Sequence, residues 1–396
     1  MKILYFTYNR IPDGDAGAIR DMEIAKLLAN KGHEIIIIGM GDSNFKEFSV
    51  KGNIKYLSLR MNKSGFIEKV KNYYGMSKRF DSISDELIEN FGAEVFIIVN
   101  LPINFLIKLK KIAQRKKIQL IHDAVEWYSP SQFKLNIFSP EFVKKEVYNR
   151  LLIDRKFNVI SISNYLNNHF IDRNIQSVRV PIFFEKNTEF QKKDLNNIVH
   201  FIYAGSPGRK DYIYTILNNF SELKKNGITN FYIHLVGLTE VDVKSEGIDL
   251  DKYSLFDNIK FYGRVTKKEV EQIYKKTHFS LLLRDSSKRY SKAGFPTKVV
   301  ESWKYSTPVI SNLTSDLNLY LTSDKNGIII NDESDLQIYH ALDTALKIDS
   351  LTYKELNKKS FQTYCHFFTS EVYSNTINNI LLSNIKKKSK KKIFED

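Results

Sequence analysis

Short apolar runs alternate with amphipathic segments along most of the chain. In the first half, apolar runs that are typical of buried strands are separated by segments whose apolar residues recur at helical spacing. The predicted strands are 2–8, 34–40, 55–59, 94–99, 118–122 and 157–163, and the clearest predicted helices are 17–31, 64–75, 102–114 and 141–154. This alternation predicts βαβ units and a parallel sheet with both faces covered.

The same pattern restarts after a polar stretch around 180–197. Its strands are predicted at 199–204, 231–237, 259–263, 278–283, 308–311 and 327–330, with helices at 210–224, 266–276, 296–305, 334–347 and 352–364. We therefore expect two doubly wound α/β domains. The expected boundaries are 1–183, a linker at 184–198, 199–368, and a final segment 369–396 that consists of a helix returning to the first domain and a basic tail.

Composition agrees with a packed two-domain protein. The chain has 396 residues with 42% hydrophobic and 13% aromatic content, too long for one ordinary core and too apolar for wholesale disorder. The single cysteine, Cys365, excludes an internal disulfide and a multi-thiolate metal site. The longest apolar run, 94–110, is interrupted by Asn100, Pro102 and Asn104, so no membrane-spanning helix is expected. A cytoplasmic protein is the expectation.

The formal charge of +15 predicts an anionic partner or a solvated lysine-rich face. Basic residues gather at 60–79, where aromatic residues interleave with them, at 108–117, and in the tail 386–392. Segments of this kind suit the anionic inner face of a membrane, and nucleic acid would be the other polyanion. We expect 60–79 to attach the protein peripherally to such a membrane and expect no nucleic-acid partner; a merely solvated face stays open as the alternative.

Several loops at predicted strand ends carry candidate chemistry in the first half. Gly14 and Gly17 precede a helix, where glycines allow a ligand to approach the backbone. Asp13 and Asp15 in that loop are ordinary turn residues, so no metal site is expected. After strand 118–122, the sequence "IHDAVEWYSP" brings together side chains that suit a sugar: His122, Asp123, Glu126, Trp127 and Tyr128. A structural histidine is the alternative for the first of these.

Two segments of the second half complete the candidate site. In "YAGSPGRKDYIY", Gly205 and Gly208 shape a turn before Arg209 and Lys210, which suits a phosphate, although a solvated helix cap explains the cations as well. The spacings of a P-loop and of a hydride-transferring Rossmann enzyme are absent. In "KAGFPTKVVESWKYSTPVISN" (292–312), Glu301 lies beside the apolar stripe of a helix that follows a glycine loop. A surface pair with Lys298 or Lys304 is the structural alternative for this carboxylate.

The order of these motifs resembles the retaining GT-B glycosyltransferases of the large bacterial family that uses nucleotide-sugar donors (glycosyltransferase family 4-like). The resemblance covers nearly the whole chain, and 258–312 is its specific part. It implies two Rossmann-like domains that face a cleft, the first holding the acceptor and the second the donor. It implies that Glu301 accepts hydrogen bonds from the donor ribose, that Lys210 and Arg209 bind phosphate, and that His122 contacts the donor sugar.

The residue chemistry and the resemblance together give three groups of candidate residues. The catalytic group is His122, Arg209 and Lys210; the donor-binding group is Gly17, Gly205, Arg264, Gly294, Phe295 and Glu301; and the acceptor or sugar group is Arg20, Asp123, Glu126 and Trp127. Two positions depart from the family pattern. Ser206 stands where an arginine usually follows the glycine of the "YAG" turn, and Ala293 stands where the first family glutamate is expected. Lys292, Arg284 or Arg289 is expected to line the space near Ala293.

These implications define the expected function. The chain is expected to be a metal-independent, configuration-retaining hexosyltransferase without a cofactor, using a UDP- or GDP-sugar. Its expected acceptor is a lipid-linked or polysaccharide precursor in cell-surface glycan synthesis, such as capsule or lipopolysaccharide. An epimerase or phosphorylase of the same fold, and a non-catalytic GT-B scaffold or polyanion-binding protein, are the alternatives. The sequence leaves the base, the sugar and the acceptor open.

Overall fold

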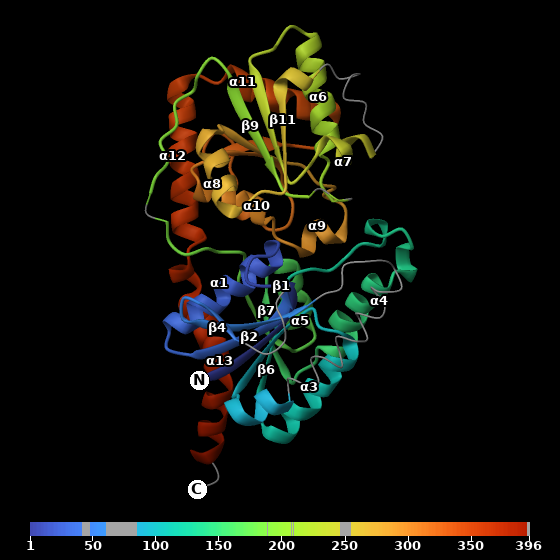
Figure 1. The fold of residues 1–396 in the computed structure, drawn as a ribbon, viewed down its shortest axis with the longest axis vertical. Helices are drawn as coiled ribbons and strands as arrows, with labels where there is room; N and C mark the ends of the chain where they lie inside the picture. Colours follow the sequence, from blue (N-terminus) through green and yellow to red (C-terminus); the bar gives the residue numbers. More distant parts are fainter. Residues whose placement is uncertain are drawn as a thin grey trace. The chain divides into compact units, whose positions relative to one another are not determined.

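The chain divides into two compact units, which are described separately (Figure 1). The computed structural model describes residues 1–41, 48–60, 85–187, 189–206, 208, 210–245 and 255–393. The first unit consists of residues 1–185 and 370–396, and the second of residues 186–369. Each is built around a largely parallel sheet, which confirms the α/β class predicted from the alternation.

The first sheet contains eight strands in the described part of the chain, in the order β3-β4-β2-β1-β5-β6-β7-β8. Only the β3–β4 pair among these is antiparallel. The strands are β1 (Lys2–Arg10), β2 (Glu34–Gly41), β3 (Ser49–Lys51), β4 (Ile54–Arg60), β5 (Val95–Val99), β6 (Gln119–Ala124), β7 (Phe157–Ser161) and β8 (Gln176–Arg179). Strands β5, β6 and β7 are buried along their whole length, as expected of parallel strands covered on both faces.

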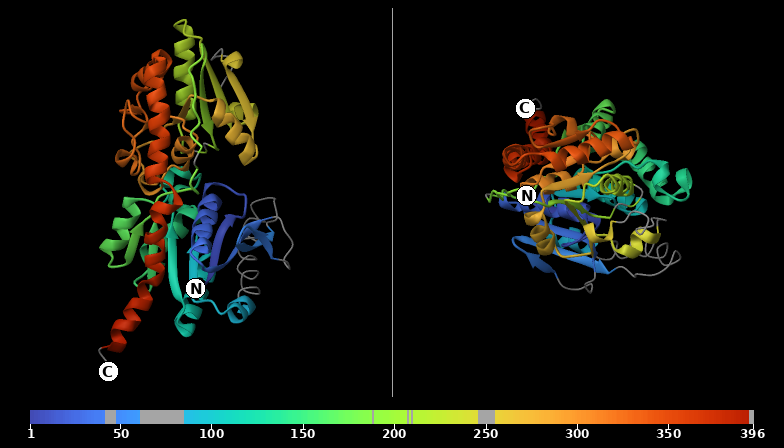
Figure 2. Two further views of the ribbon diagram at one scale, coloured as in Figure 1. Left: turned by 90° about the vertical axis from the view of Figure 1, so that its left-hand side faces the viewer. Right: turned by 90° about the horizontal axis from the view of Figure 1, so that it is seen from above.

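The helices of this unit include one from the far end of the chain. They are α1 (Ala16–Asn30), α3 (Ile103–Lys116), α4 (Pro140–Val147), α5 (Asn164–Asp172) and α13 (Ser370–Ile393). Helix α13 contacts α1 and β6, and it runs along the rest of the first unit in Figure 1 and in the left view of Figure 2. The side-chain amides of Gln119 and Asn158 donate to the carbonyl of Ile380 at 3.0 and 3.2 Å, which fixes the helix to β6 and β7.

The second sheet contains six described strands, all parallel, in the order β11-β10-β9-β12-β13-β14. They are β9 (Val199–Ala204), β10 (Phe231–Val236), β11 (Ile259–Gly263), β12 (Phe279–Leu282), β13 (Val309–Asn312) and β14 (Gly327–Ile330). The order reverses between β9 and β12, and ligands of open α/β sheets bind at such a switch point, outside the carboxyl ends of the strands.

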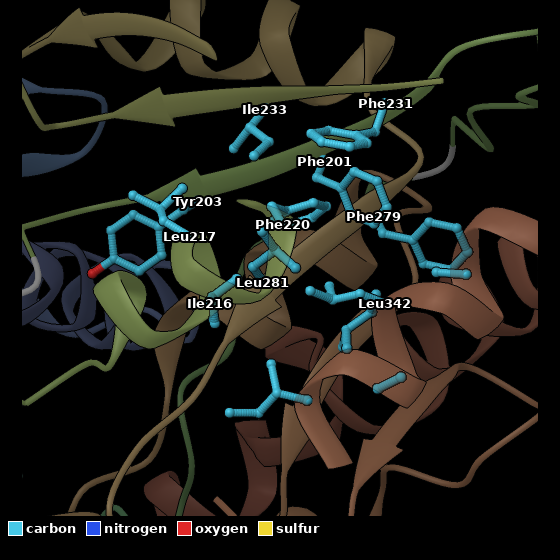
Figure 3. Close-up of a cluster of buried hydrophobic side chains, with 14 of the residues drawn as sticks. Phe201, Tyr203, Ile216, Leu217, Phe220, Phe231, Ile233, Phe279, Leu281 and Leu342 are labelled. Carbon is cyan, nitrogen blue, oxygen red and sulfur yellow. The ribbon is translucent and has the colours of Figure 1, made fainter. Parts of the chain in front are cut away.

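Helices cover both faces of the second sheet (Figure 1). They are α6 (Ile213–Lys225), α7 (Glu240–Ser245), α8 (Lys267–Lys276), α9 (Arg289–Ala293), α10 (Thr297–Lys304), α11 (Asp335–Lys347) and α12 (Ser350–Phe367). The core between α6 and the sheet combines aliphatic side chains with a group of packed aromatic rings (Figure 3). Phe220 lies 4.9 Å, centroid to centroid, from both Phe201 and Phe231, so the helix is held by edge-to-face and tilted ring contacts.

The polar stretch between the units is attached to the second one. Lys193 is buried, and its ammonium donates to the carbonyls of Tyr274 and Thr277 at 2.7 and 2.9 Å and to the hydroxyl of Thr307. The neighbouring Gln191 backbone also accepts from the Asn357 amide at 3.0 Å. Residues 189–195 therefore lie against the C-terminal ends of α8 and α10 and against Asn357 inside α12, although they form neither helix nor strand.

Several element predictions needed correction. The predicted helix 210–224 begins at Ile213, because Asp211 forms an isolated bridge with Arg284. The predicted helix 141–154 is α4 followed by a π-helical turn, Tyr148–Leu152. The short elements β3, β8, α7 and α9 were not predicted. The predicted helix 64–75 lies outside the described residues. No helix in the described ranges is long and apolar enough to span a membrane.

Candidate functional site

Three neighbouring strands of the second sheet end in glycines with positive φ. These are Gly205 after β9, Gly237 after β10 and Gly263 at the end of β11, with φ of 135°, 88° and 59°. The Gly205 N–H donates to Val236 at 2.8 Å, and the Gly237 N–H donates to Gly263 at 2.7 Å. A Cβ on Gly237 would lie 2.9 Å from the Gly205 carbonyl. Glycine is thus required for these loops to pack together at the switch point.

An ionic network joins the ends of β9 and β12 to helix α10. The Arg284 guanidinium, just after β12, donates to Asp211 at 2.7 Å, and the Lys298 ammonium of α10 contacts the other oxygen of the same carboxylate. Lys298 also donates to the Tyr203 hydroxyl at 2.6 Å, which itself donates to Asp211 at 2.7 Å. Figure 3 shows this hydroxyl directed away from the apolar cluster that holds the Tyr203 ring.

Burial sets the electrostatics of this network. It acts to raise the pKa of the Asp211 carboxyl, but Arg284 and Lys298 outweigh it and hold that pKa well below its ordinary value. Burial lowers the pKa of Lys298 to about 8; Asp211 opposes this change, whereas Arg284 adds to it. One buried carboxylate is therefore shared by two cations, and the three charges sum to +1.

Glu301 lies one helical turn after Lys298 on α10. It is half-buried, and its carboxylate makes no hydrogen bond or ion pair with any residue that the structure describes. Burial raises the pKa of Glu301, while the charges of Lys304, Lys267 and Lys298 act in the opposite direction. The surface pair that was the alternative for Glu301 is absent among the described residues, because Lys298 is bonded to Asp211 instead. Glu301 can therefore accept hydrogen bonds from a ligand.

The other predicted donor residues have different environments. Lys210 is half-buried and lowers the pKa of Lys298, although less than burial does. Arg264 is exposed directly after Gly263.

The Gly294 N–H donates to the Tyr290 carbonyl at 3.1 Å, whereas the Phe295 N–H has no acceptor among the described residues. The Phe295 ring is buried against aromatic rings, Tyr320 and Phe368. Arg209 lies outside the described residues.

In the first unit, His122 is fully buried on β6 with one unsatisfied nitrogen. Its Nδ1 lies 3.0 Å from the Ile98 carbonyl, so Nδ1 carries the proton. Burial, and then the charge of Lys145, lowers the pKa of His122 to about 3, so the ring is neutral at physiological pH. Nε2 is a lone-pair acceptor and has no hydrogen-bond partner in the described chain. This histidine can accept a hydrogen bond from a hydroxyl but cannot act as an acid.

Arg20 and Asp123 form a buried, two-pronged ion pair. The Arg20 Nε and Nη2 donate to Asp123 at 2.9 and 2.8 Å, and Nη1 donates to the Pro181 carbonyl at 3.0 Å. Both side chains are almost inaccessible. The pair joins α1 to β6 and to Pro181, which follows β8. Both residues therefore have a structural role, whatever else they contact.

Gly17 lies in the first turn of α1. Its N–H donates at 3.0 Å to Asp15, the N-cap of the helix, so this donor is satisfied within the chain. A Cβ at this position would lie 2.8 Å from the Asn9 amide, which explains the glycine. Asp13 is paired with Lys51 at 2.7 Å. Neither aspartate is grouped with further metal-binding side chains in the described ranges.

Trp127 and Glu126 follow β6 in different environments. The Trp127 ring is buried, with its Nε1 donating to Glu146 at 2.8 Å and its face near His169 and Arg150. It packs inside the unit. Glu126 is half-buried and bonds the Tyr128 hydroxyl, whose pKa is raised first by burial and then by this carboxylate. Their sugar-binding roles stay predictions.

The structure thus brings Gly205, Lys210 and Glu301 to one edge of the second sheet, and His122 and Asp123 to one strand of the first. Sequence reasoning missed the central side chains of the second site, Tyr203, Asp211 and Lys298. Two features of the sequence pointed to these residues: Asp211 ends the motif "RKD", and Lys298 lies three residues before Glu301. Nothing in the local sequence indicates that Lys298 pairs with Asp211.

Comparisons with known proteins agree with this geometry. Residues 185–363 match the family model described as glycosyl transferases group 1. A sucrose-phosphate synthase (tll1590) from Thermosynechococcus elongatus has a similar structure, with a TM-score of 0.77, 13% identity, and coverage of 98% of this chain and 100% of that chain. A search of curated protein sequences found no match.

Two further solved structures resemble the whole chain. WaaG, a glycosyltransferase involved in lipopolysaccharide biosynthesis, has a TM-score of 0.68 at 12% identity and covers 95% of this chain and 99% of its own. Anabaena Alr3699/HepE in complex with UDP-glucose has a TM-score of 0.66 at 14% identity, covering 97% and 100%. The predicted pair of Rossmann-like domains is confirmed: the chain has the GT-B glycosyltransferase fold, and its residues 185–363 match the glycosyl transferases group 1 family.

Proposed function

We propose that this protein is a glycosyltransferase that moves a sugar from a nucleotide-sugar donor, with retention of configuration and without a metal ion, to a lipid-linked or polysaccharide-precursor acceptor. The observation that carries the proposal is Glu301. Its carboxylate is half-buried and unpaired among the described residues, at the switch-point edge of a domain that matches the group 1 family. Leaving such a group without a partner is costly unless a ligand supplies one.

A ribose fits this requirement. An ionised carboxylate only accepts hydrogen bonds, and its two oxygens match two adjacent hydroxyls. The raised pKa of Glu301, caused by burial, favours a ligand that donates hydrogen bonds over one that brings negative charge to the same atoms. The diphosphate of the donor would then lie toward Lys210 and Gly205.

Bond cleavage leaves negative charge on a nucleoside diphosphate, and fixed cations and N–H groups can stabilise it. Lys210, and by resemblance Arg209, supply such charge, and the Phe295 N–H has no acceptor among the described residues. His122 would accept a hydrogen bond from a sugar hydroxyl through Nε2, because that nitrogen is unprotonated. In the proposed mechanism the leaving phosphate accepts the proton of the acceptor hydroxyl, so no separate base is assigned.

The donor is proposed to be a UDP- or GDP-sugar, with UDP-glucose tested first because Alr3699/HepE was solved with it. The acceptor is proposed to belong to cell-surface glycan synthesis, such as capsule or lipopolysaccharide, at the cytoplasmic face of the membrane. Segment 60–79 was expected to contact that face; beyond Arg60, the last residue of β4, it lies outside the described residues.

A thermal-shift screen against UDP, GDP, dTDP and their sugars tests the donor assignment, followed by turnover of any nucleotide sugar that stabilises the protein. We expect one nucleoside diphosphate series to raise the Tm, because a ligand that binds only the folded state stabilises it. The variants Glu301→Ala and Lys210→Ala should each lower turnover at least about tenfold while remaining folded. Stabilisation without turnover on any acceptor would favour a non-catalytic GT-B protein instead.

Vesicle co-sedimentation tests the membrane assignment. The wild type should bind anionic vesicles at low salt, and charge reversal of Lys69, Lys71, Lys78 and Arg79 should abolish binding, since each basic residue near such a surface contributes about 1 kcal/mol. Absence of binding by the wild type would indicate a soluble acceptor.

A further inference from the structure

The network around Asp211 has more positive than negative charge, and it is largely buried. The Lys298 and Arg284 side chains are 16% and 14% exposed, and Asp211 is 3% exposed. Two fixed cations therefore share one carboxylate. A buried network with this imbalance is unfavourable by itself, and an anion that reaches the exposed part of a cation would neutralise it.

Lys298 is the cation that reaches the glycine turn. A Cβ on Gly205 would lie 2.6 Å from the Lys298 Cε and 3.1 Å from its Nζ, so the ammonium lies directly against the backbone of this turn. Any side chain at position 205 would displace it. The turn follows β9 at the switch point, beside Lys210, and the same helix carries Glu301 one turn later.

The position of Lys298 also relates to Ser206. Ser206 stands at this place of the turn, and the charged side chain that lies against Gly205 comes from α10, more than 90 residues along the chain. The cation therefore approaches the turn from α10, the helix that precedes β13. Because α10 also carries Glu301, one helix would hold two groups that face different parts of one ligand.

We propose that Lys298 is a further donor-binding residue, whose ammonium contacts the diphosphate of the donor while Asp211 and Arg284 hold it in place. This inference rests on the proposed function and extends it to a residue that the sequence motifs do not assign. Asp211 is then a positioning residue that restrains Lys298 and also partly neutralises it. If the ion pair between Lys298 and Asp211 were purely structural, removal of either partner would weaken ligand binding in the same way.

Inorganic pyrophosphate is the probe, because it contains the diphosphate without a base or sugar. Isothermal titration of the full chain, without divalent cations, compares the wild type with Lys298→Met and Asp211→Asn. Lys298→Met should weaken pyrophosphate binding at least about tenfold, since a charge-assisted contact is lost. Asp211→Asn should lower the Tm but bind pyrophosphate no more weakly than the wild type, because the asparagine side-chain oxygen still accepts a hydrogen bond from Lys298 while a negative charge beside the ligand is removed.

Two controls separate folding from binding. Lys347→Met breaks an exposed ion pair with Asp343 on α11 and should leave pyrophosphate affinity unchanged. If Lys298→Met folds poorly because Asp211 is left without Lys298, the double variant Lys298→Met/Asp211→Asn removes both charges. It should bind pyrophosphate at least about tenfold more weakly than Asp211→Asn alone.

The outcomes are distinct. Unchanged affinity in Lys298→Met, or equal weakening by Lys298→Met and Asp211→Asn, would overturn the inference and leave Lys298 as a structural lysine, while the donor-site proposal would stand. A wild type that binds neither pyrophosphate nor any nucleoside diphosphate would contradict the proposed function itself.

Discussion

At the scale of single residues, Glu301 and Lys298 lie on the same helix but have opposite surroundings. Lys298 is bonded to Asp211 and Tyr203, whereas the Glu301 carboxylate has no partner among the described residues. A side chain kept unpaired at a buried position adds nothing to folding stability. The unpaired Glu301 carboxylate is therefore better explained by ligand binding than by folding stability. A variant at this position can separate the two effects.

Substitution of Glu301 by glutamine tests this difference. Glu301→Gln keeps the shape of the side chain and removes a charge that burial disfavours, so the Tm should stay the same or rise. Nucleotide-sugar turnover should fall at least about tenfold, because a charged acceptor of ligand hydrogen bonds is lost. Differential scanning fluorimetry and initial rates measure the two effects. Glu355→Gln, at an exposed position of α12, is the control, and equal behaviour of the two variants would contradict the assignment.

At the scale of elements, the segment before β9 behaves as part of the second unit. Burial lowers the pKa of Lys193 in this segment well below its ordinary value. The Lys193 side chain nevertheless donates to three acceptors, two at the end of α8 and one in the loop before β13. Removal of this side chain would leave the carbonyls of Tyr274 and Thr277 buried without their donor. The segment is therefore expected to contribute to stability and not only to connect the units.

The variant Lys193→Met should lower the free energy of unfolding by about 2–3 kcal/mol, the cost of unsatisfied buried acceptors. Urea unfolding monitored by fluorescence measures this loss. Lys192→Met, one residue earlier and exposed, should change it by less than about 0.5 kcal/mol. A similar small change in both variants would show that the Lys193 contacts do not stabilise the unit.

At the scale of the whole molecule, buried neutral histidines connect stability to pH. Burial, as the largest cause, lowers the pKa of His122 and His234 to about 3 and that of His278 to about 4. In the unfolded chain a histidine titrates near about 6.5. Between these values the unfolded state binds more protons at these histidines than the folded state does, so they lower the stability as the pH decreases below about 6.5, whereas Asp21, whose pKa burial raises to about 7, acts in the opposite direction.

The free energy of unfolding should therefore decrease between about pH 6.5 and 5, by up to about 1.4 kcal/mol per pH unit for each of these histidines. Urea unfolding across this range measures the slope. His234→Gln should reduce the slope, whereas His366→Gln, at an exposed position of α12, should not. An unchanged slope in His234→Gln would show that this histidine titrates alike in the folded and unfolded chains.

Metal dependence also belongs to the scale of the whole protein. We expect EDTA to leave initial rates nearly unchanged, because the proposed donor site stabilises the leaving diphosphate with lysine and N–H groups. Asp13 and Asp15, the acidic pair of the first unit, are engaged with Lys51 and with the start of α1. Loss of activity with EDTA that Mn²⁺ or Mg²⁺ restores would contradict the proposed mechanism and direct attention to these two residues.

Local pattern was sufficient for the architecture, since strand and helix periodicities are properties of neighbouring residues. Runs such as 34–40 and 199–204 therefore predicted β2 and β9, and the glycine turn with Glu301 identified the edge at which the candidate site lies. The short elements β3, β8, α7 and α9 escaped prediction because so few residues carry little periodicity.

Pairing across the fold was decided only by tertiary structure. Lys298 could equally have paired with Glu301, three residues away, and the structure instead joins it to Asp211, 87 residues away. It likewise leaves Nε2 of His122 without a partner in the described chain and encloses the Trp127 ring. Burial and the partner of a charge depend on which strands and helices meet, and this is set by the parallel crossovers of the sheet rather than by the neighbouring sequence.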